Sequence, residues 1–250
     1  MRFEDKVAIV TGAGRNIGES VATLFAAEGA RVVAVDMDEE RGQRVADEIK
    51  ASNHDAIYVK ADVSDEASVK ELVSAAVDAY GRIDILVNNV AISDNKNIRE
   101  ITLEEWNRTI AVTLTSQFLC CKYVGEQMIA QGDGGAIVNI GSTSGFQGRG
   151  SAVAYAAAKG GVANLMRALA VQFAPYKIRV NSIVPNKIGS PVGKAEFDPT
   201  RAVPNLVGRA GKPDELARAV LFMAGEDASF VVGENLVVDG GLSAMMSGGS

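Results

Sequence analysis

The chain has little of the chemistry that metal ions and disulfides require: two cysteines and one histidine in 250 residues. Cys120 and Cys121 are adjacent within a helical pattern, so their side chains point in different directions. We therefore expect two reduced thiols and no disulfide, as is usual in cytoplasmic proteins. His54 stands alone among scattered acids, and the sequence predicts no metal site.

Long apolar runs and an excess of basic residues are also lacking. No apolar run approaches the ~20 residues of a membrane-spanning helix. The start, MRFEDKVAIV, has acids before its apolar residues, unlike a signal peptide. The formal net charge is -6, whereas nucleic-acid-binding proteins carry a basic face. We expect a cytoplasmic protein that binds neither membranes nor nucleic acids.

Short β-branched runs alternate with longer amphipathic segments along the chain. Several runs are apolar on consecutive residues, which indicates strands buried on both faces, as in a parallel sheet covered by helices. Right-handed crossovers between such strands build a doubly wound sheet. We predict one α/β domain over residues 1–250, with about seven strands and helices on both faces. The expected strands are 6–12, 31–36, 56–62, 83–89, 135–142, 178–185 and 235–241, and the expected helices are 17–28, 38–52, 64–80, 103–131 and one containing Tyr155.

The segment 186–212 interrupts this alternation. It contains Pro191, Pro199 and Pro204 and has no clear hydrophobic period. Long irregular loops at the carboxyl edge of a sheet usually carry function. We expect a substrate loop here.

The first strand runs into TGAGRNIG, a turn that holds Gly12, Gly14 and Gly18. A glycine-rich turn between a strand and a helix presents free backbone N–H groups at the helix N-terminus, where phosphate binds. Asp36 ends the next expected strand, where a carboxylate can accept hydrogen bonds from ribose hydroxyls. Together these features indicate a dinucleotide site.

Ser142, Tyr155 and Lys159 form a second pattern. Tyr155 and Lys159 are four residues apart, on one face of a helix, and Ser142 lies thirteen residues before the tyrosine. A free tyrosine has a pKa of about 10, and a lysine cation beside it lowers that pKa by favouring the phenolate. A serine hydroxyl can orient a substrate oxygen. This set suits proton transfer at a substrate oxygen.

These motifs together resemble the classical short-chain dehydrogenases/reductases over essentially the whole chain. TGAGRNIG is similar to the family's T-G-x-x-x-G-x-G turn, Ser142, Tyr155 and Lys159 are similar to its triad, and ADVSD, NNVA, RVNSIVP and VVDGG resemble further family segments. The resemblance implies a Rossmann fold and the interconversion of a secondary alcohol and a ketone. Tyr155 would act as acid and base, Lys159 would hold the nicotinamide ribose, and Ser142 would orient the substrate. The implied cofactor contacts are Gly12, Gly14, Arg15, Asn16, Ile17, Gly18, Asp36, Asp62, Val63, Asn89, Tyr155, Lys159 and Ile188.

The chain departs from the family pattern at several positions. Asn16 replaces the middle glycine, a change that the tolerance of asparagine for left-handed backbone angles permits. Val90 and Ala91 stand where the family has Ala-Gly, and Asn186 stands where a glycine follows the proline. Thr113 stands where the family has an asparagine thought to anchor a water near the lysine. We expect an intact triad with an altered proton relay.

Asp36 favours NAD over NADP, because its carboxylate would repel a 2′-phosphate. Arg15 is the opposing feature, since NADP-preferring members often carry a basic residue near this turn. Two alternatives stay open: a weakly catalytic NAD-binding sensor or scaffold, and an NADPH-dependent 3-oxoacyl-thioester reductase. The polar side chains expected to line the substrate pocket are Ser93, Ser142, Ser144, Gln147 and Asn186.

The helices around Cys120 and Ala163 are rich in small and apolar residues. In the family these two helices build a tetramer interface. We therefore expect a homotetramer, with a dimer as the alternative, acting on a small-molecule alcohol or ketone.

Overall fold

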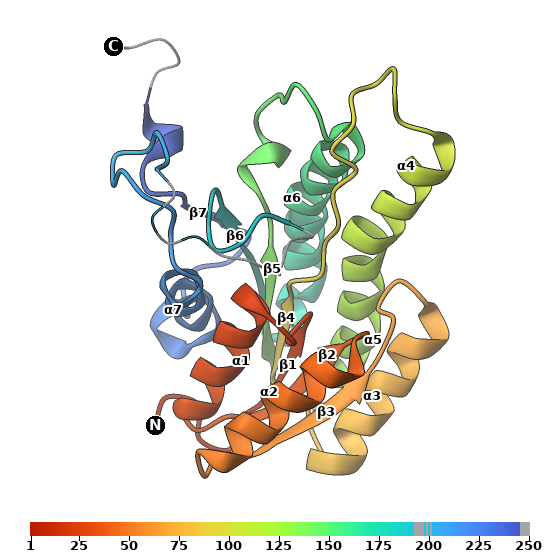
Figure 1. Cartoon of the computed structure of the whole chain (residues 1–250). Helices are drawn as coiled ribbons and strands as arrows, with labels where there is room; N and C mark the ends of the chain where they lie inside the picture. Colours follow the sequence, from red (N-terminus) through yellow and green to blue (C-terminus); the bar gives the residue numbers. More distant parts are fainter. Residues whose placement is uncertain (193–197, 199, 201, 246–250) are drawn as a thin grey trace.

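A computed structural model describes residues 1–192, 198, 200 and 202–245 of the chain. Within these residues, seven strands form one parallel sheet in the order β3-β2-β1-β4-β5-β6-β7 (Figure 1). The doubly wound parallel sheet predicted from the sequence is therefore confirmed. The strands are β1 Val7–Thr11, β2 Arg31–Asp36, β3 Ala56–Lys60, β4 Ile85–Asn88, β5 Gly135–Ile140, β6 Ile178–Pro185 and β7 Asn235–Val238.

Helices cover both faces of the sheet (Figure 1). α1, α2 and α7 share one hydrophobic core with the sheet, whereas α3, α5 and α6 share the other. α7 fills a stretch in which the sequence patterns identified no helix. The helices are α1 Asn16–Ala27, α2 Glu39–Ala51, α3 Glu66–Tyr80, α4 Leu103–Ile110, α5 Ser116–Gln131, α6 Val153–Phe173 and α7 Pro213–Ala224.

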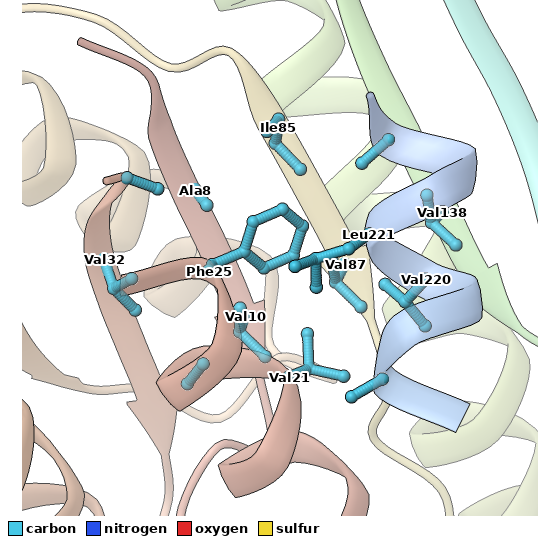
Figure 2. Packing of buried hydrophobic residues seen from close by; sticks show 14 of the residues in the cluster. Ala8, Val10, Val21, Phe25, Val32, Ile85, Val87, Val138, Val220 and Leu221 are labelled. Carbon is cyan, nitrogen blue, oxygen red and sulfur yellow. The ribbon is translucent and has the colours of Figure 1, made fainter. Parts of the chain in front are cut away.

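Side chains from alternate positions of each strand enter opposite cores, as the pleat requires. Figure 2 shows the core that includes α1 and α7, where Phe25 lies among Val10, Val87 and Leu221. All four side chains are fully buried. Burial of one such side chain stabilises the fold by about 1.5–3 kcal/mol, so this core holds α1 and α7 against the central strands β1 and β4.

The single helix predicted over 103–131 is divided in the structure. α4 begins at the predicted capping box, in which Thr102 and Glu105 bond to each other's backbone N–H groups. A π-helical turn, Ala111–Thr115, then separates α4 from α5. Such turns recur at functional sites, and this one contains Thr113.

The strand order reverses between β1 and β4. In doubly wound sheets, ligands bind outside the carboxyl ends of the strands at such a reversal. The loops after β1, β2, β3, β4, β5 and β6 meet at this edge, and they line the cavity described below.

Candidate active site

A cavity of about 820 Å³ lies at the carboxyl edge of the sheet. Its volume is within the range of about 300–1,000 Å³ that small-molecule and cofactor sites occupy. Most of the side chains predicted for the cofactor and substrate line it. These are Gly12, Arg15, Asn16, Ile17, Asp36, Asp62, Val63, Asn89, Ser93, Ser142, Ser144, Gln147, Tyr155, Lys159, Asn186 and Ile188.

Gly14 and Gly18 are absent from this lining and shape the turn instead. A Cβ atom on Gly18 would lie 2.0 Å from the carbonyl oxygen of Gly12, so only glycine allows the turn to close onto α1. A Cβ atom on Gly14 would lie 2.7 Å from Oδ2 of Asp36. Gly12 itself has a φ of 64° and faces the cavity. The glycines therefore bring the backbone close to the space where phosphates would lie.

Asn16 has a φ of 55°, a left-handed backbone conformation that asparagine tolerates better than most residues. Its side-chain Nδ2 donates a hydrogen bond to Oγ of Ser190 at 2.9 Å. A Cβ atom on Gly189 would lie 2.0 Å from Asn16 Oδ1, so the two segments pack tightly. Asn16 thus links the glycine turn to the loop after β6, a contact that the local sequence did not reveal.

Asp36 lies at the end of β2, with its carboxylate directed at the glycine turn. Oδ2 accepts the Gly14 N–H and Oδ1 accepts the Asp38 N–H, both at 3.0 Å. Arg41, on α2, also lines the cavity, with Nη2 3.8 Å from Asp36 Oδ1 and 3.2 Å from Asp38 Oδ2. Arg41 is not among the residues predicted from the sequence, although its position in the first turn of the helix after Asp36 could have indicated it.

Tyr155 and Lys159 lie on α6, and Ser142 follows β5. Nζ of Lys159 is 5.8 Å from the centre of the Tyr155 ring and donates a hydrogen bond to the carbonyl oxygen of Ile140 at 2.5 Å. Oγ of Ser142 accepts the Ser144 N–H at 3.1 Å, and Ser142 acts to lower the pKa of Tyr155. The structure therefore brings the three predicted side chains together at one end of the cavity.

Burial dominates the protonation of this site. It raises the pKa of Tyr155, an effect opposed by the hydrogen bond with Ser142 and by the positive charge of Arg149. Burial lowers the pKa of Lys159 to about 7. The spacing predicts that Lys159 lowers the pKa of Tyr155, whereas in the structure the groups that act against burial are Ser142 and Arg149. The reason is desolvation, which disfavours the ammonium form of a fully buried lysine.

The N-terminus of α6 is held by the loop after β4. Ala152 precedes the helix with a φ of 63° and has no side chain that could cap it. Oδ1 of Asp94 instead accepts the Tyr155 N–H at 3.1 Å, and the carbonyl oxygen of Lys96 accepts the Ala152 N–H at 2.7 Å. Asp94 therefore helps to fix the position of Tyr155 from outside its own helix.

Thr113 is fully buried and does not line the cavity. Its hydroxyl donates to the carbonyl oxygen of Ile92 and accepts the Ile92 N–H, both at 3.1 Å. Ile92 does line the cavity, directly after the NNVA segment. Thr113 thus satisfies both backbone groups of one wall residue, a contact made possible by the π-helical turn.

Arg149 lies beside the triad in the loop between β5 and α6, and the sequence analysis missed it. Its Nη1 donates to Oγ of Ser144 at 3.1 Å, and its Cζ is 5.9 Å from the centre of the Tyr155 ring. Asn186 donates to Oγ1 of Thr143 at 2.6 Å. The sequence signal for Arg149 was its position as a basic residue between Ser142 and Tyr155, but the glycines around it suggested only a turn.

The described part of the loop 186–212 is closed at its base. Gly189 donates its N–H to the Gly211 carbonyl oxygen at 2.9 Å, and Gly211 donates its N–H to that of Lys187 at 3.0 Å. Residues 193–197, 199 and 201 of the predicted substrate loop lie outside the described residues.

Both cysteines are buried and unpaired. Among the residues that the structure describes, no cluster of three metal-ligating side chains occurs. In the same part of the chain, no helix combines the length and apolarity needed to cross a membrane.

Comparisons with known proteins identify related sequences. A family model described as Enoyl-(Acyl carrier protein) reductase matches residues 12–243. The chain is 40% identical over 247 residues to the cis-4-hydroxycyclohexanecarboxylate dehydrogenase of Sinomonas cyclohexanicum, covering 97% of this chain and 98% of the relative. It is also 40% identical over 241 residues to the cyclohexanol dehydrogenase of an Acinetobacter species, covering 96% and 95%.

A solved structure shares the fold. The crystal structure of a short-chain type dehydrogenase/reductase from Mycobacterium marinum matches with a TM-score of 0.90 and 30% identity, covering 97% of each chain. The family match, the relatives and this shared fold span nearly all of the sequence. The chain therefore belongs to the short-chain dehydrogenase/reductase family of oxidoreductases.

Proposed function

We propose that the protein interconverts a secondary alcohol and a ketone using NAD(H). The observation that carries the proposal is the junction, in one cavity, of a glycine-turn cradle with Ser142, Tyr155 and Lys159. Relatives at 40% identity carry names of dehydrogenases that act on cyclic secondary alcohols, one neutral and one bearing a carboxylate. Both names describe the oxidation of a secondary alcohol.

The residues present fit a nicotinamide dinucleotide. Gly12 and Gly18 keep the turn clear of side-chain atoms, and the N-terminus of α1 offers backbone donors to a pyrophosphate. Asp36 would accept hydrogen bonds from the adenosine ribose, Asp62 and Val63 would lie beside the adenine, and Lys159 would hold the nicotinamide ribose. When bound, the nicotinamide supplies or accepts the hydride.

The protein's own part in the reaction is proton transfer and orientation. Tyr155 takes the proton from the substrate oxygen in oxidation and returns it in reduction. Ser142 hydrogen-bonds the same oxygen and holds it near the tyrosine hydroxyl. Lys159, when protonated, favours the phenolate through its charge, since the buried surroundings screen little. Thr113 and Asp94 act indirectly. Thr113 fixes the cavity residue Ile92, and Asp94 fixes the start of α6.

NAD is proposed over NADP because of Asp36. Its side chain is only 12% exposed and lies at the edge of the cavity where the adenosine ribose belongs. A 2′-phosphate at this position would bring two negative groups together in a poorly hydrated space. Arg15 and Arg41 oppose this repulsion in part, since both line the same end of the cavity.

The test measures the change in nicotinamide absorbance on turnover by purified protein. Cyclic and linear secondary alcohols are tested with NAD or NADP, and the corresponding ketones with the reduced cofactors. The panel includes a 3-oxoacyl thioester, because the description of the matching family model names a reductase that acts on substrates of the acyl carrier protein. We expect turnover with NAD(H) that Tyr155→Phe lowers by at least about 10²-fold while cofactor binding persists. Cofactor binding with no turnover on any substrate would favour the sensor alternative, and NADPH-dependent thioester reduction would favour the other.

We also propose a cytoplasmic homotetramer. Phe118 on α5 and Val171 on α6 are large apolar side chains that are 45% and 76% exposed on the two helices in question. Paired copies would bury them. Light scattering coupled to size exclusion measures the mass directly, and a monomer across the micromolar range would refute this proposal.

A further inference from the structure

The two ends of the cavity differ in charge. Among the described lining residues, the only carboxylates are Asp36 and Asp62, which follow β2 and β3 at the adenosine end. Arg149 and Lys187 line the opposite end, together with the triad. Asp94, whose Oδ1 accepts the Tyr155 N–H, does not line the cavity. A substrate reaching Tyr155 therefore meets the side chains of Arg149 and Lys187 in a wall that holds no described carboxylate at this end.

Arg149 is placed to contact a ligand. Its Cζ lies 5.9 Å from the centre of the Tyr155 ring, and one N–H group donates to Oγ of Ser144. The guanidinium is exposed and forms no ion pair with any carboxylate in the described part of the chain. A guanidinium has five N–H donors in a planar fork, so most of them are available.

The chemistry of this group selects its ligand. A guanidinium fork matches the two oxygens of a carboxylate, and such bonds are shorter and stronger than those between neutral groups. Ser144 holds the side chain through a neutral hydroxyl, which leaves its full charge for a second partner. A neutral hydroxyl can accept a hydrogen bond from this group but brings no negative charge to pair with the guanidinium.

We propose that Arg149 is a specificity residue that binds the carboxylate of a hydroxy or oxo acid while the carbinol or carbonyl carbon lies at Tyr155. The inference rests on the proposed function, because it requires the substrate to react at Tyr155. It narrows the substrate class from secondary alcohols in general to those that carry an anionic group.

The experiment compares two cyclic ketones, 4-oxocyclohexanecarboxylate and its methyl ester, whose main difference is the charge. Steady-state kinetics are measured with NADH for the wild type, Arg149→Met, Arg149→Lys and the control Arg99→Met. Arg99 is an exposed arginine outside the cavity and its side chain makes no hydrogen bond in the described structure. The 3-oxo isomer and its ester repeat the comparison at a second spacing.

We expect the wild type to prefer the acid over the ester. Arg149→Met should lower kcat/KM for the acid by roughly 10- to 100-fold, mainly through KM, as the loss of a charged hydrogen bond implies. Arg149→Lys should restore part of the loss, and Arg99→Met should leave both substrates unchanged. Removal of the Arg149 charge also affects Tyr155, but this acts on acid and ester alike and cancels in their ratio.

Two results separate this inference from the proposed function. If the ester is reduced as well as the acid and Arg149→Met leaves their ratio unchanged, the inference fails while ketone reduction stands. If neither ketone is reduced, calorimetric binding of cyclohexanecarboxylate decides: loss of binding in Arg149→Met, with retention in Arg99→Met, supports the carboxylate site, and equal binding in all variants overturns it.

Discussion

Replacement of Asp36 by asparagine tests the assignment of the adenosine ribose to the end of β2. The substitution keeps the size of the side chain and one acceptor oxygen, so one of the two N–H bonds from Gly14 and Asp38 can persist. What changes is the charge. Arg41 lies 3.8 Å away and stays in place, which leaves this end of the cavity more positive than before.

The magnitude follows from Coulomb's law. A carboxylate and a 2′-phosphate about 5 Å apart at an effective dielectric constant of about 20 repel each other by roughly 3 kcal/mol per pair of unit charges. Exchange of a charged acceptor for a neutral one weakens the ribose hydrogen bonds by about 1 kcal/mol. The sum of about 4 kcal/mol predicts that Asp36→Asn shifts the NAD to NADP ratio of kcat/KM by about 10³-fold towards NADP.

The assay measures kcat/KM for both cofactors at one fixed alcohol concentration. Arg41→Met is measured beside it, because it should shift the NAD to NADP ratio in the opposite direction. Loss of Arg41 removes a cation from the same end of the cavity, so the ratio should move further towards NAD. Circular dichroism confirms that each variant is folded. A ratio that stays within about threefold of the wild type in folded Asp36→Asn would refute the reasoning, because at a few ångströms the repulsion would be far larger.

Three further predictions concern buried groups. Because the pKa of Lys159 falls from 10.5 to about 7 on folding, the unfolded chain binds one proton more above about pH 7, so the Tm of the cofactor-free protein should rise from pH 7 to pH 9 relative to Lys159→Met. A flat difference would contradict this. Thr113→Val leaves the N–H and C=O of Ile92 unpaired and should lower the free energy of unfolding by about 1–3 kcal/mol in urea titrations. Burial raises the pKa of both Cys120 and Cys121, so a thiol reagent should label neither in native protein and both after denaturation.

Local pattern was sufficient for the sheet and for the residue types of the site. Consecutive apolar residues in runs such as 7–10 predict strands buried on both faces, and parallel strands are joined by right-handed crossovers that are usually helical. The glycine turn, Asp36 and the Tyr155–Lys159 spacing are local too, since each depends on neighbours within one strand, turn or helix. These features therefore follow from the sequence alone.

Only the tertiary structure decided which distant residues meet. Asn16 bonds Ser190 across 174 positions of the chain, and Thr113 bonds Ile92 because a π-helical turn interrupts a sequence that reads as one helix. Arg149 lies over Tyr155 by virtue of a loop whose glycines predict a turn and nothing more.

The pKa shifts of Tyr155 and Lys159 also could not be predicted from local sequence. The spacing predicts that Lys159 lowers the pKa of Tyr155. Burial raises the pKa of Tyr155 and lowers that of Lys159, so any effect of the lysine charge acts against desolvation. Desolvation depends on every side chain packed around a group, whereas spacing reports only one helix face. Local patterns predicted the parallel sheet and the residues proposed for the reaction, whereas the packing of the whole chain set the burial and the hydrogen-bond partners of those residues.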